Sequence, residues 1–230
     1  MRWLLTLVVG LTAGFAGAAL WDATGLGGRS TRDYLLANPE ILPEAMEVLQ
    51  QREQAALIEP LRGELEMPFP GAVLGNPTGS ITLVEFSDYA CTYCRQSVAH
   101  VAALIAANPD LRVVIREYPI LAPESVEAAR MALAAAQQGK FAAFHDAMFR
   151  LGPPSAASIT AAAREAGVDL AKAEAAIASG AFDGQLQANG VLAARLGISG
   201  TPGWVVGDRA LNGAVGEAAM AEAIAEARRS

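Results

Sequence analysis

Two cysteines three residues apart, between an apolar run and a helix-like run, constrain this chain more than any other feature. Cys91 and Cys94 are the only cysteines among 230 residues. The apolar run Ile81–Val84 precedes them, and a helix-like run from Gln96 to Ala107 follows. We therefore predict a buried strand that delivers a C-x-x-C motif onto the first turn of a helix.

This spacing has a physical reason. Residues i and i+3 share one face of a helix, so the two sulfurs can reach disulfide distance without unwinding the backbone. The helix N-terminus presents free N–H groups and a partial positive charge, which favour the thiolate form of the first cysteine. We expect Cys91 to be the exposed nucleophile and Cys94 the resolving thiol.

Two other interpretations of the cysteine pair stay open. A structural zinc needs about four ligands, which His100 and His145 would have to complete. A purely structural disulfide would stabilise little, because the entropic gain grows with the length of the closed loop. Thiol–disulfide exchange is the hypothesis that the spacing favours.

Glu85 is an anomaly in an otherwise apolar strand, where a buried carboxylate is costly. We hypothesise that it exchanges protons with Cys94 through water, as a general base with a raised pKa. The alternative is an ordinary exposed glutamate at a sheet edge.

Composition limits the possible functions. An apolar fraction of 53% is ample for a core, and the length allows one or two domains. A formal net charge of −7, with no cluster of basic residues, argues against a nucleic-acid partner.

Residues 1–20 have the pattern of a targeting segment. Arg2 precedes an uncharged, mostly apolar stretch, Leu4–Leu20, with small residues that suit cleavage after Ala18 or Ala19. At about 17 residues the stretch is also close to a membrane span, so residues 4–20 are either a cleaved signal peptide or an inner-membrane anchor. Both readings place the rest of the chain in an oxidising, periplasmic or other extracytoplasmic compartment.

Residues 31–66 read as helices. Four apolar residues there stand seven apart, namely Leu35, Leu42, Leu49 and Ala56, although prolines interrupt the run. The region is too short for a core of its own. It therefore packs on the main domain or on copies of itself, as a homo-oligomer.

Residues 70–230 read as an α/β domain. The strand and helix around the cysteines are followed by a second strand at 111–118, which predicts parallel pairing through a right-handed crossover. Helical patterns fill about residues 122–196. A short hairpin and a final helix end the chain.

This order resembles the thioredoxin fold, and the helical block resembles the inserted subdomain of DsbA-type exported thiol oxidoreductases. The resemblance covers about residues 70–230 and is specific at three segments: Phe86–Tyr89, Lys140–Asp146 and Gly200–Pro202. The segment Asn38–Leu42 resembles the N-terminal extension of the ScsC-like subgroup, some of which oligomerise through it.

The resemblance implies roles for further residues. Glu85 stands at the position of the buried acid of the family. Thr201-Pro202 is expected to be a cis peptide facing the cysteines, which presents the Thr201 backbone to an extended substrate by strand addition. Thr92 and Tyr93 would tune the redox potential, and Thr92 stands where many relatives carry proline.

The expected function is an exported thiol–disulfide oxidoreductase that acts on protein substrates through the Cys91–Cys94 couple, without a cofactor or a metal. An oxidase would need a membrane redox partner that resets the cysteines, whereas an isomerase or reductase works from the reduced form. The alternative is a Cu(I)-binding or metal-stress accessory protein that uses the same soft thiolates.

Overall fold

The computed structural model describes residues 2–23 and 26–229. Two compact units are present, one up to Arg52 and one from Glu53 onward. The division falls inside the segment 31–66, which the sequence analysis treated as one region.

The first unit is helical. It contains α1 (Arg2–Ala23), α2 (Leu26–Ala37) and the first part of α3 (Ile41–Ile58). The helical extension therefore begins before residue 31, where the sequence analysis placed its start. Residue 1 of the predicted targeting segment lies outside the described residues. Among the helices that are described, none is long and apolar enough to cross a membrane.

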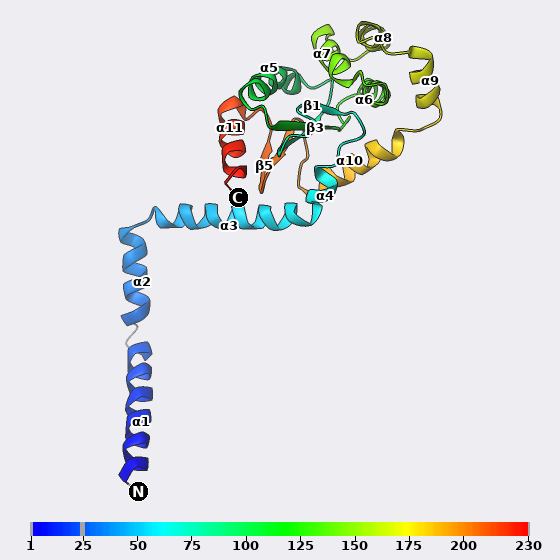
Figure 1. The fold of residues 1–230 in the computed structure, drawn as a ribbon. Coiled ribbons are helices and arrows are strands. Elements are labelled where there is room, and N and C mark those ends of the chain that lie inside the picture. Colours follow the sequence, from blue (N-terminus) through cyan, green and yellow to red (C-terminus); the bar gives the residue numbers. More distant parts are fainter. Residues whose placement is uncertain (1, 24–25, 230) are drawn as a thin grey trace. The chain divides into compact units, whose positions relative to one another are not determined.

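The second unit is built on a five-stranded sheet of order β1-β3-β2-β4-β5 (Figure 1). The strands are β1 (Val73–Gly75), β2 (Ile81–Ser87), β3 (Leu111–Glu117), β4 (Gly203–Val206) and β5 (Arg209–Asn212). Strand β2 is central, parallel to β3 and antiparallel to β4. The predicted parallel pairing, terminal hairpin and thioredoxin-like α/β fold are confirmed.

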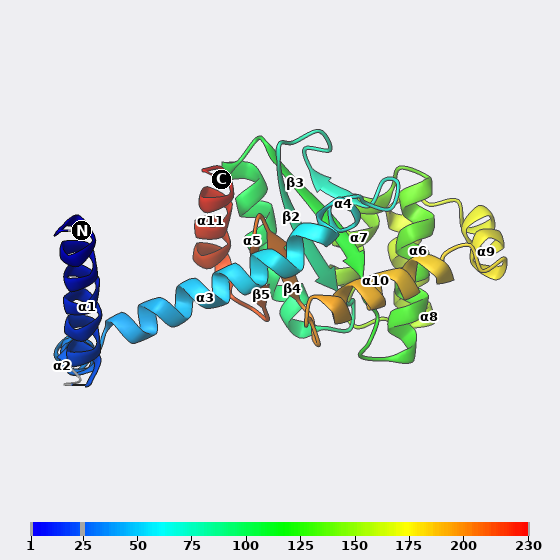
Figure 2. The same ribbon diagram turned by 90° about the horizontal axis from the view of Figure 1, so that it is seen from below.

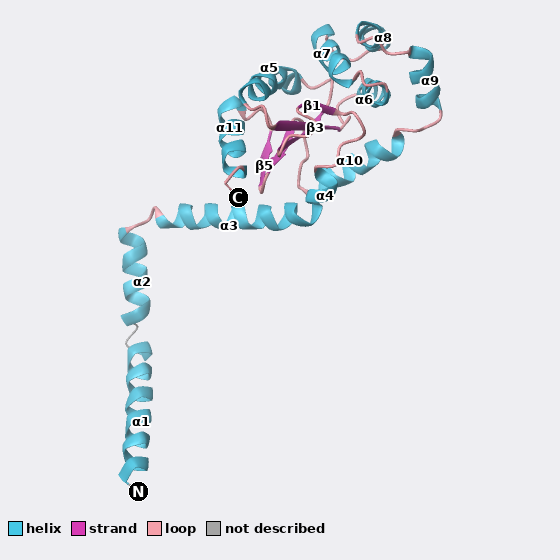
Figure 3. Ribbon diagram, in the orientation of Figure 1, coloured by secondary structure: helices cyan, strands magenta, loops and turns pink. Residues whose placement is uncertain are grey.

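Alternation along the strands gives the sheet two buried faces. Figure 3 shows helices of this unit on both sides of the strands. Leu83, Val113 and Trp204 belong to the core on one face, with side chains from α5 (Thr92–Ala107), α6 (Pro123–Gln137), α7 (Phe141–Leu151) and α11 (Gly216–Ala227). The helices α8 (Ala156–Glu165) and α9 (Leu170–Ala178) extend this core. Glu85 and Ser87 alternate in phase with Leu83, so they point to this same face.

The opposite face carries Val84, Phe86 and Val114. It is covered by the end of α3, the short helices η1 (Glu59–Leu61) and α4 (Arg62–Leu65), and α10 (Asp183–Arg195); Figure 2 shows α4 and α10 from this side. Helices α6 to α10 all lie between β3 and β4 in the chain.

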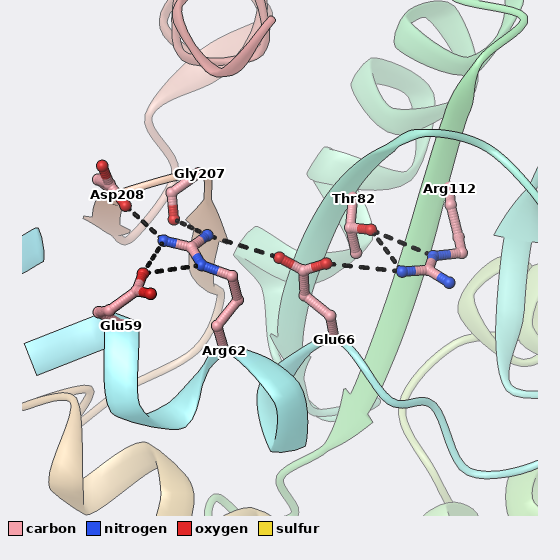
Figure 4. A network of polar contacts seen from close by, with 7 residues as sticks. All are labelled: Glu59, Arg62, Glu66, Thr82, Arg112, Gly207 and Asp208. Atoms are coloured by element: carbon pink, nitrogen blue, oxygen red, sulfur yellow. Dashed lines mark hydrogen bonds and ion pairs between the residues drawn. The ribbon is translucent and has the colours of Figure 1, made fainter. Parts of the chain in front are cut away.

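Two arginines hold the η1–α4 segment on this face. The guanidinium of Arg116 is buried and donates to the carbonyl oxygens of Glu64, Leu65 and Met67, the last two at 3.0 and 2.6 Å. Arg62 lies at the surface and pairs with Asp208 and Glu59, in the network of Figure 4 that continues through Glu66 to Arg112 and Thr82.

Candidate active site

Cys91 is the N-cap of α5, as the C-x-x-C spacing predicts. Its φ and ψ of −78° and 118° are extended, and its sulfur accepts the N–H of Cys94 at 3.4 Å. An N-cap side chain accepts a hydrogen bond from one of the backbone N–H groups that the first turn of a helix leaves free. The Cys91 sulfur therefore sits where the helix N-terminus stabilises negative charge.

The cis peptide lies against the same sulfur. The Thr201–Pro202 bond is cis, as expected, and Cys91 Sγ is 3.2 Å from the carbonyl oxygen of Thr201. Strand β4 follows directly and pairs with β2, so the sheet itself fixes this contact. The Thr201 backbone is thus positioned beside the nucleophile.

Cys94 is one turn further along α5 and fully buried. Both thiols are free and both are buried: Cys91 is only 5% exposed, so the expectation of an exposed nucleophile is wrong. Burial raises the pKa of the Cys94 thiol strongly, and the nearby Glu85 carboxyl raises it further. Cys94 is therefore a protonated thiol at rest and needs a base before it can act as a nucleophile.

Glu85 is buried in the central strand and is not the exposed edge residue of the alternative interpretation. The fully buried indole of Trp204 stands opposite it on β4. Burial raises the pKa of Glu85 to about 8, while hydrogen bonding with Ser87 lowers it. A carboxyl with such a pKa can exchange a proton at neutral pH.

Thr92 and Tyr93 lie on the exposed first turn of α5, and the Tyr93 side chain is 58% exposed. The zinc interpretation finds no support in the described part of the chain, which holds no group of three or more potential metal-ligating side chains.

The sequence analysis missed Asp88, which fixes the turn before Cys91. Its buried carboxylate accepts the backbone N–H groups of Ala90 (2.8 Å), Ile120 (2.8 Å) and Leu121 (2.9 Å). One side chain thereby ties the active-site turn to the loop after β3. The motif Phe86–Tyr89 was visible in the sequence, but two of the three partners of Asp88 lie more than thirty residues away.

A second buried polar group was also missed. Tyr89 Oη donates to Glu117 Oε1 at 3.1 Å and lies 3.3 Å from Nδ1 of His145 on α7. Burial lowers the pKa of His145 to about 4 and raises the pKa of Glu117 well above its usual range. His145 and Tyr89 are therefore uncharged near neutral pH, and burial favours the protonated form of Glu117. The His145 ring packs on Phe141 and Phe149.

Comparison with known proteins agrees with this geometry. Residues 82–225 match the family of DSBA-like thioredoxin domains, and residues 31–56 match the N-terminal domain of the copper resistance protein ScsC. A thioredoxin-like oxidoreductase from Silicibacter pomeroyi DSS-3 is 40% identical with a TM-score of 0.66, over 69% of this chain and 92% of that one.

Two further relatives are more distant. A periplasmic thioredoxin-like protein from Salmonella enterica serovar Typhimurium is 27% identical with a TM-score of 0.63, over 74% of this chain and 97% of that one. The Na(+)/H(+) antiporter NhaA 3 of Salinispora tropica is 28% identical over 76% of this chain, which spans only 28% of that longer protein. The family match covers most of the second unit and contains both cysteines and the cis-proline, so the chain belongs to the family of DSBA-like thioredoxin domains.

Proposed function

We propose that this protein is an extracytoplasmic thiol–disulfide oxidoreductase that acts on protein substrates through the Cys91–Cys94 couple. The observation that carries the proposal is the contact of Cys91 Sγ with the Thr201 carbonyl oxygen at 3.2 Å. It places a helix-capping thiol beside a backbone to which an extended client segment can add as a strand. A periplasmic relative supports the compartment.

The chemistry follows from the different surroundings of the two thiols. Cys91, at the helix N-terminus, attacks a client disulfide and forms a mixed disulfide. Buried Cys94 then resolves it, with Glu85 as the base that accepts its proton. In the oxidising direction the steps run in reverse, and Glu85 returns the proton to the departing Cys94 thiolate.

The test compares two substrates. Oxidase activity forms disulfides in a reduced client, whereas isomerase activity recovers native activity from a scrambled one. Cys91→Ser should abolish both activities, and Cys94→Ser should trap the mixed disulfide with the client. Full activity of Cys91→Ser on both substrates would exclude the proposal.

Oligomerisation and a redox partner belong to the same proposal. The exposed side chains of Leu42, Met46 and Leu49 on α3 give residues 31–66 a surface that a second copy can cover. A partner in the membrane would reset the cysteines between turnovers.

A second candidate function is Cu(I) binding by the reduced pair. It is favoured by the match of residues 31–56 to a copper resistance protein. Two thiolates suit this soft ion. Titration of the reduced protein with Cu(I) under anaerobic conditions tests it, and Cys94→Ala should then lose tight binding. Equal binding by the variant would reject the copper role.

A further inference from the structure

Ser87 lies at the end of β2, two residues after Glu85 and on the same face of the sheet. Its side chain is 3% exposed, like that of Glu85, and Cys94 on the helix above is fully buried. The backbone is fixed, because the Ser87 carbonyl oxygen accepts the N–H of Tyr118 at 2.8 Å. Glu85, Ser87 and Cys94 are thus all buried on the same side of the sheet.

The Ser87 hydroxyl has no settled partner. Its Oγ is buried and makes no hydrogen bond of standard geometry. Buried polar atoms are almost always paired, so an unpaired one needs an explanation. A Ser87 hydroxyl that turns toward Glu85 or Cys94 would lower the pKa of that group. Ser87 and Glu85 share one face of β2 and Cys94 belongs to the core on that face, and a hydroxyl there bonds more strongly to either group once it is an anion.

We propose that the Ser87 hydroxyl relays the proton between Cys94 and Glu85. This inference rests on the proposed thiol–disulfide exchange and replaces the water that the sequence analysis placed between these two groups. A hydroxyl suits the task because it donates and accepts at once. The Glu85 carboxyl and the Cys94 thiol then need no direct contact.

The step balances as follows for resolution of a mixed disulfide. The S–H bond of Cys94 breaks as Ser87 Oγ takes that proton, while the O–H proton of Ser87 passes to the Glu85 carboxylate. The Cys94 thiolate attacks Cys91 Sγ and forms the Cys91–Cys94 bond. The bond from Cys91 to the client sulfur breaks, and the client leaves as a thiolate. The two cysteines are oxidised and the client disulfide is reduced.

Other titratable groups lie near Ser87, and their effects must be distinguished from that of its hydroxyl. Strand β3 places Glu117 opposite Ser87, and the turn contributes Asp88 and Tyr89. Tyr89 bonds to Glu117 and contacts His145 of α7, and the Glu85 carboxyl raises the pKa of both Tyr89 and Glu117. Strand β4 brings Trp204, and the part of α11 in this core is apolar, with Met220, Ala223 and Ile224. Among the groups that act on Glu85 and Cys94, only Ser87 can lower the pKa of both through its side-chain hydroxyl.

The experiment follows the reaction of the reduced full-length protein with excess oxidised glutathione. Quench-flow and mass spectrometry give the rate at which the Cys91–glutathione mixed disulfide forms and the unimolecular rate at which Cys94 resolves it. Ser87→Ala should slow resolution on the order of 100-fold, the size of a general acid–base contribution, and leave formation unchanged. The inflection of the resolution rate near pH 8 should disappear.

Two further variants serve as controls. Ser87→Thr keeps the hydroxyl and should restore the rate and the inflection. Ser125→Ala removes another buried hydroxyl without a partner, on α6, and should behave as the wild type. Ser87→Ala removes no standard hydrogen bond, so it should fold. If Ser87→Ala does not fold, the rate at which the wild type resolves the mixed disulfide is measured in mixtures of H2O and D2O. A relay moves two protons in one step, so this rate should depend on the D2O fraction along a curve.

The outcomes separate this inference from the proposed function. If the wild type forms no mixed disulfide at Cys91, the thiol–disulfide function itself fails. If the wild type resolves the mixed disulfide and Ser87→Ala matches it, the relay is overturned and the function stands. Equal slowing by Ser87→Ala and Ser87→Thr, or a linear dependence on D2O, also overturns the relay.

Discussion

Glu85 makes the folded protein sensitive to pH. Its pKa is raised by burial from 4.5 to about 8, so between these values the folded protein holds a proton that the unfolded chain has released. Stability must therefore fall as the pH rises through this window, by at most about 1.4 kcal/mol per pH unit.

Glu85→Gln should remove this part of the dependence and become more stable than the wild type towards pH 8. Urea unfolding of the reduced proteins at pH 5, 6.5 and 8 measures the difference. Glu117 has the same sign and remains in both proteins, but the Glu85 carboxyl also raises its pKa, so Glu85→Gln weakens that part of the dependence as well. Parallel pH dependences of the two proteins would show that the pKa of Glu85 is not raised in the folded protein.

Arg116 and Arg62 hold the same segment but should differ greatly in what they contribute. Arg116 is buried and serves three backbone carbonyls, whereas the side chain of Arg62 is 31% exposed and its partners Glu59 and Asp208 are more exposed still. Surface ion pairs contribute little, whereas each buried acceptor left without a donor costs about 1–3 kcal/mol.

Arg116→Met should therefore lower the free energy of unfolding by roughly 3 kcal/mol, and Arg62→Met by less than about 1 kcal/mol. Chemical denaturation of both variants gives the comparison. An equal loss in both would contradict this assignment.

How far the site could be predicted depends on the distance in sequence between partners. Cys91, Cys94 and Glu85 lie within ten residues, so strand alternation and helix spacing were enough to give them roles. Ser87 and Glu117 meet only through the β2–β3 register, and Tyr89 meets His145 only because α7 packs over the turn. Neither the register nor that packing can be derived from local patterns.

Among the elements, the η1–α4 segment belongs with the sheet. Ile58, Leu61 and Leu65 are almost completely buried in the core below β2 and β3. The sequence predicted helices over residues 31–66, but helical spacing alone does not say which of them pack on a neighbouring sheet. That is why the division at Arg52 was not foreseen.

Deletions test this division. Removal of residues 1–52 should leave the melting temperature of the second unit within a few degrees of the intact protein. Removal of residues 1–67 takes away three buried aliphatic side chains, worth roughly 5 kcal/mol, and the carbonyls that Arg116 binds. That form should melt far lower or fail to fold, and equal melting of both forms would refute the assignment.

For the molecule as a whole, the proposed oligomer depends on one face of α3. Leu42, Met46 and Leu49 share that face by helical spacing, and each is more than half exposed. Val48 is apolar too but points elsewhere around the helix, which makes it a matched control.

Leu49→Glu should convert an oligomer to a monomer in light scattering, because it places a charge in the apolar contact, whereas Val48→Glu should not. An intact protein that is already monomeric, or an oligomer that survives Leu49→Glu, would show that this face of α3 does not form the contact between copies.

The redox character of the whole protein depends on the Cys91–Cys94 couple, and its reduction potential tests the account most directly. Titration against glutathione, with alkylation and mass spectrometry, should show one two-electron transition between the two thiols and their disulfide. We expect a potential between about −270 and −120 mV, the range of this fold. A potential below about −300 mV, typical of structural disulfides, or no bond between Cys91 and Cys94 at any poise, would contradict it.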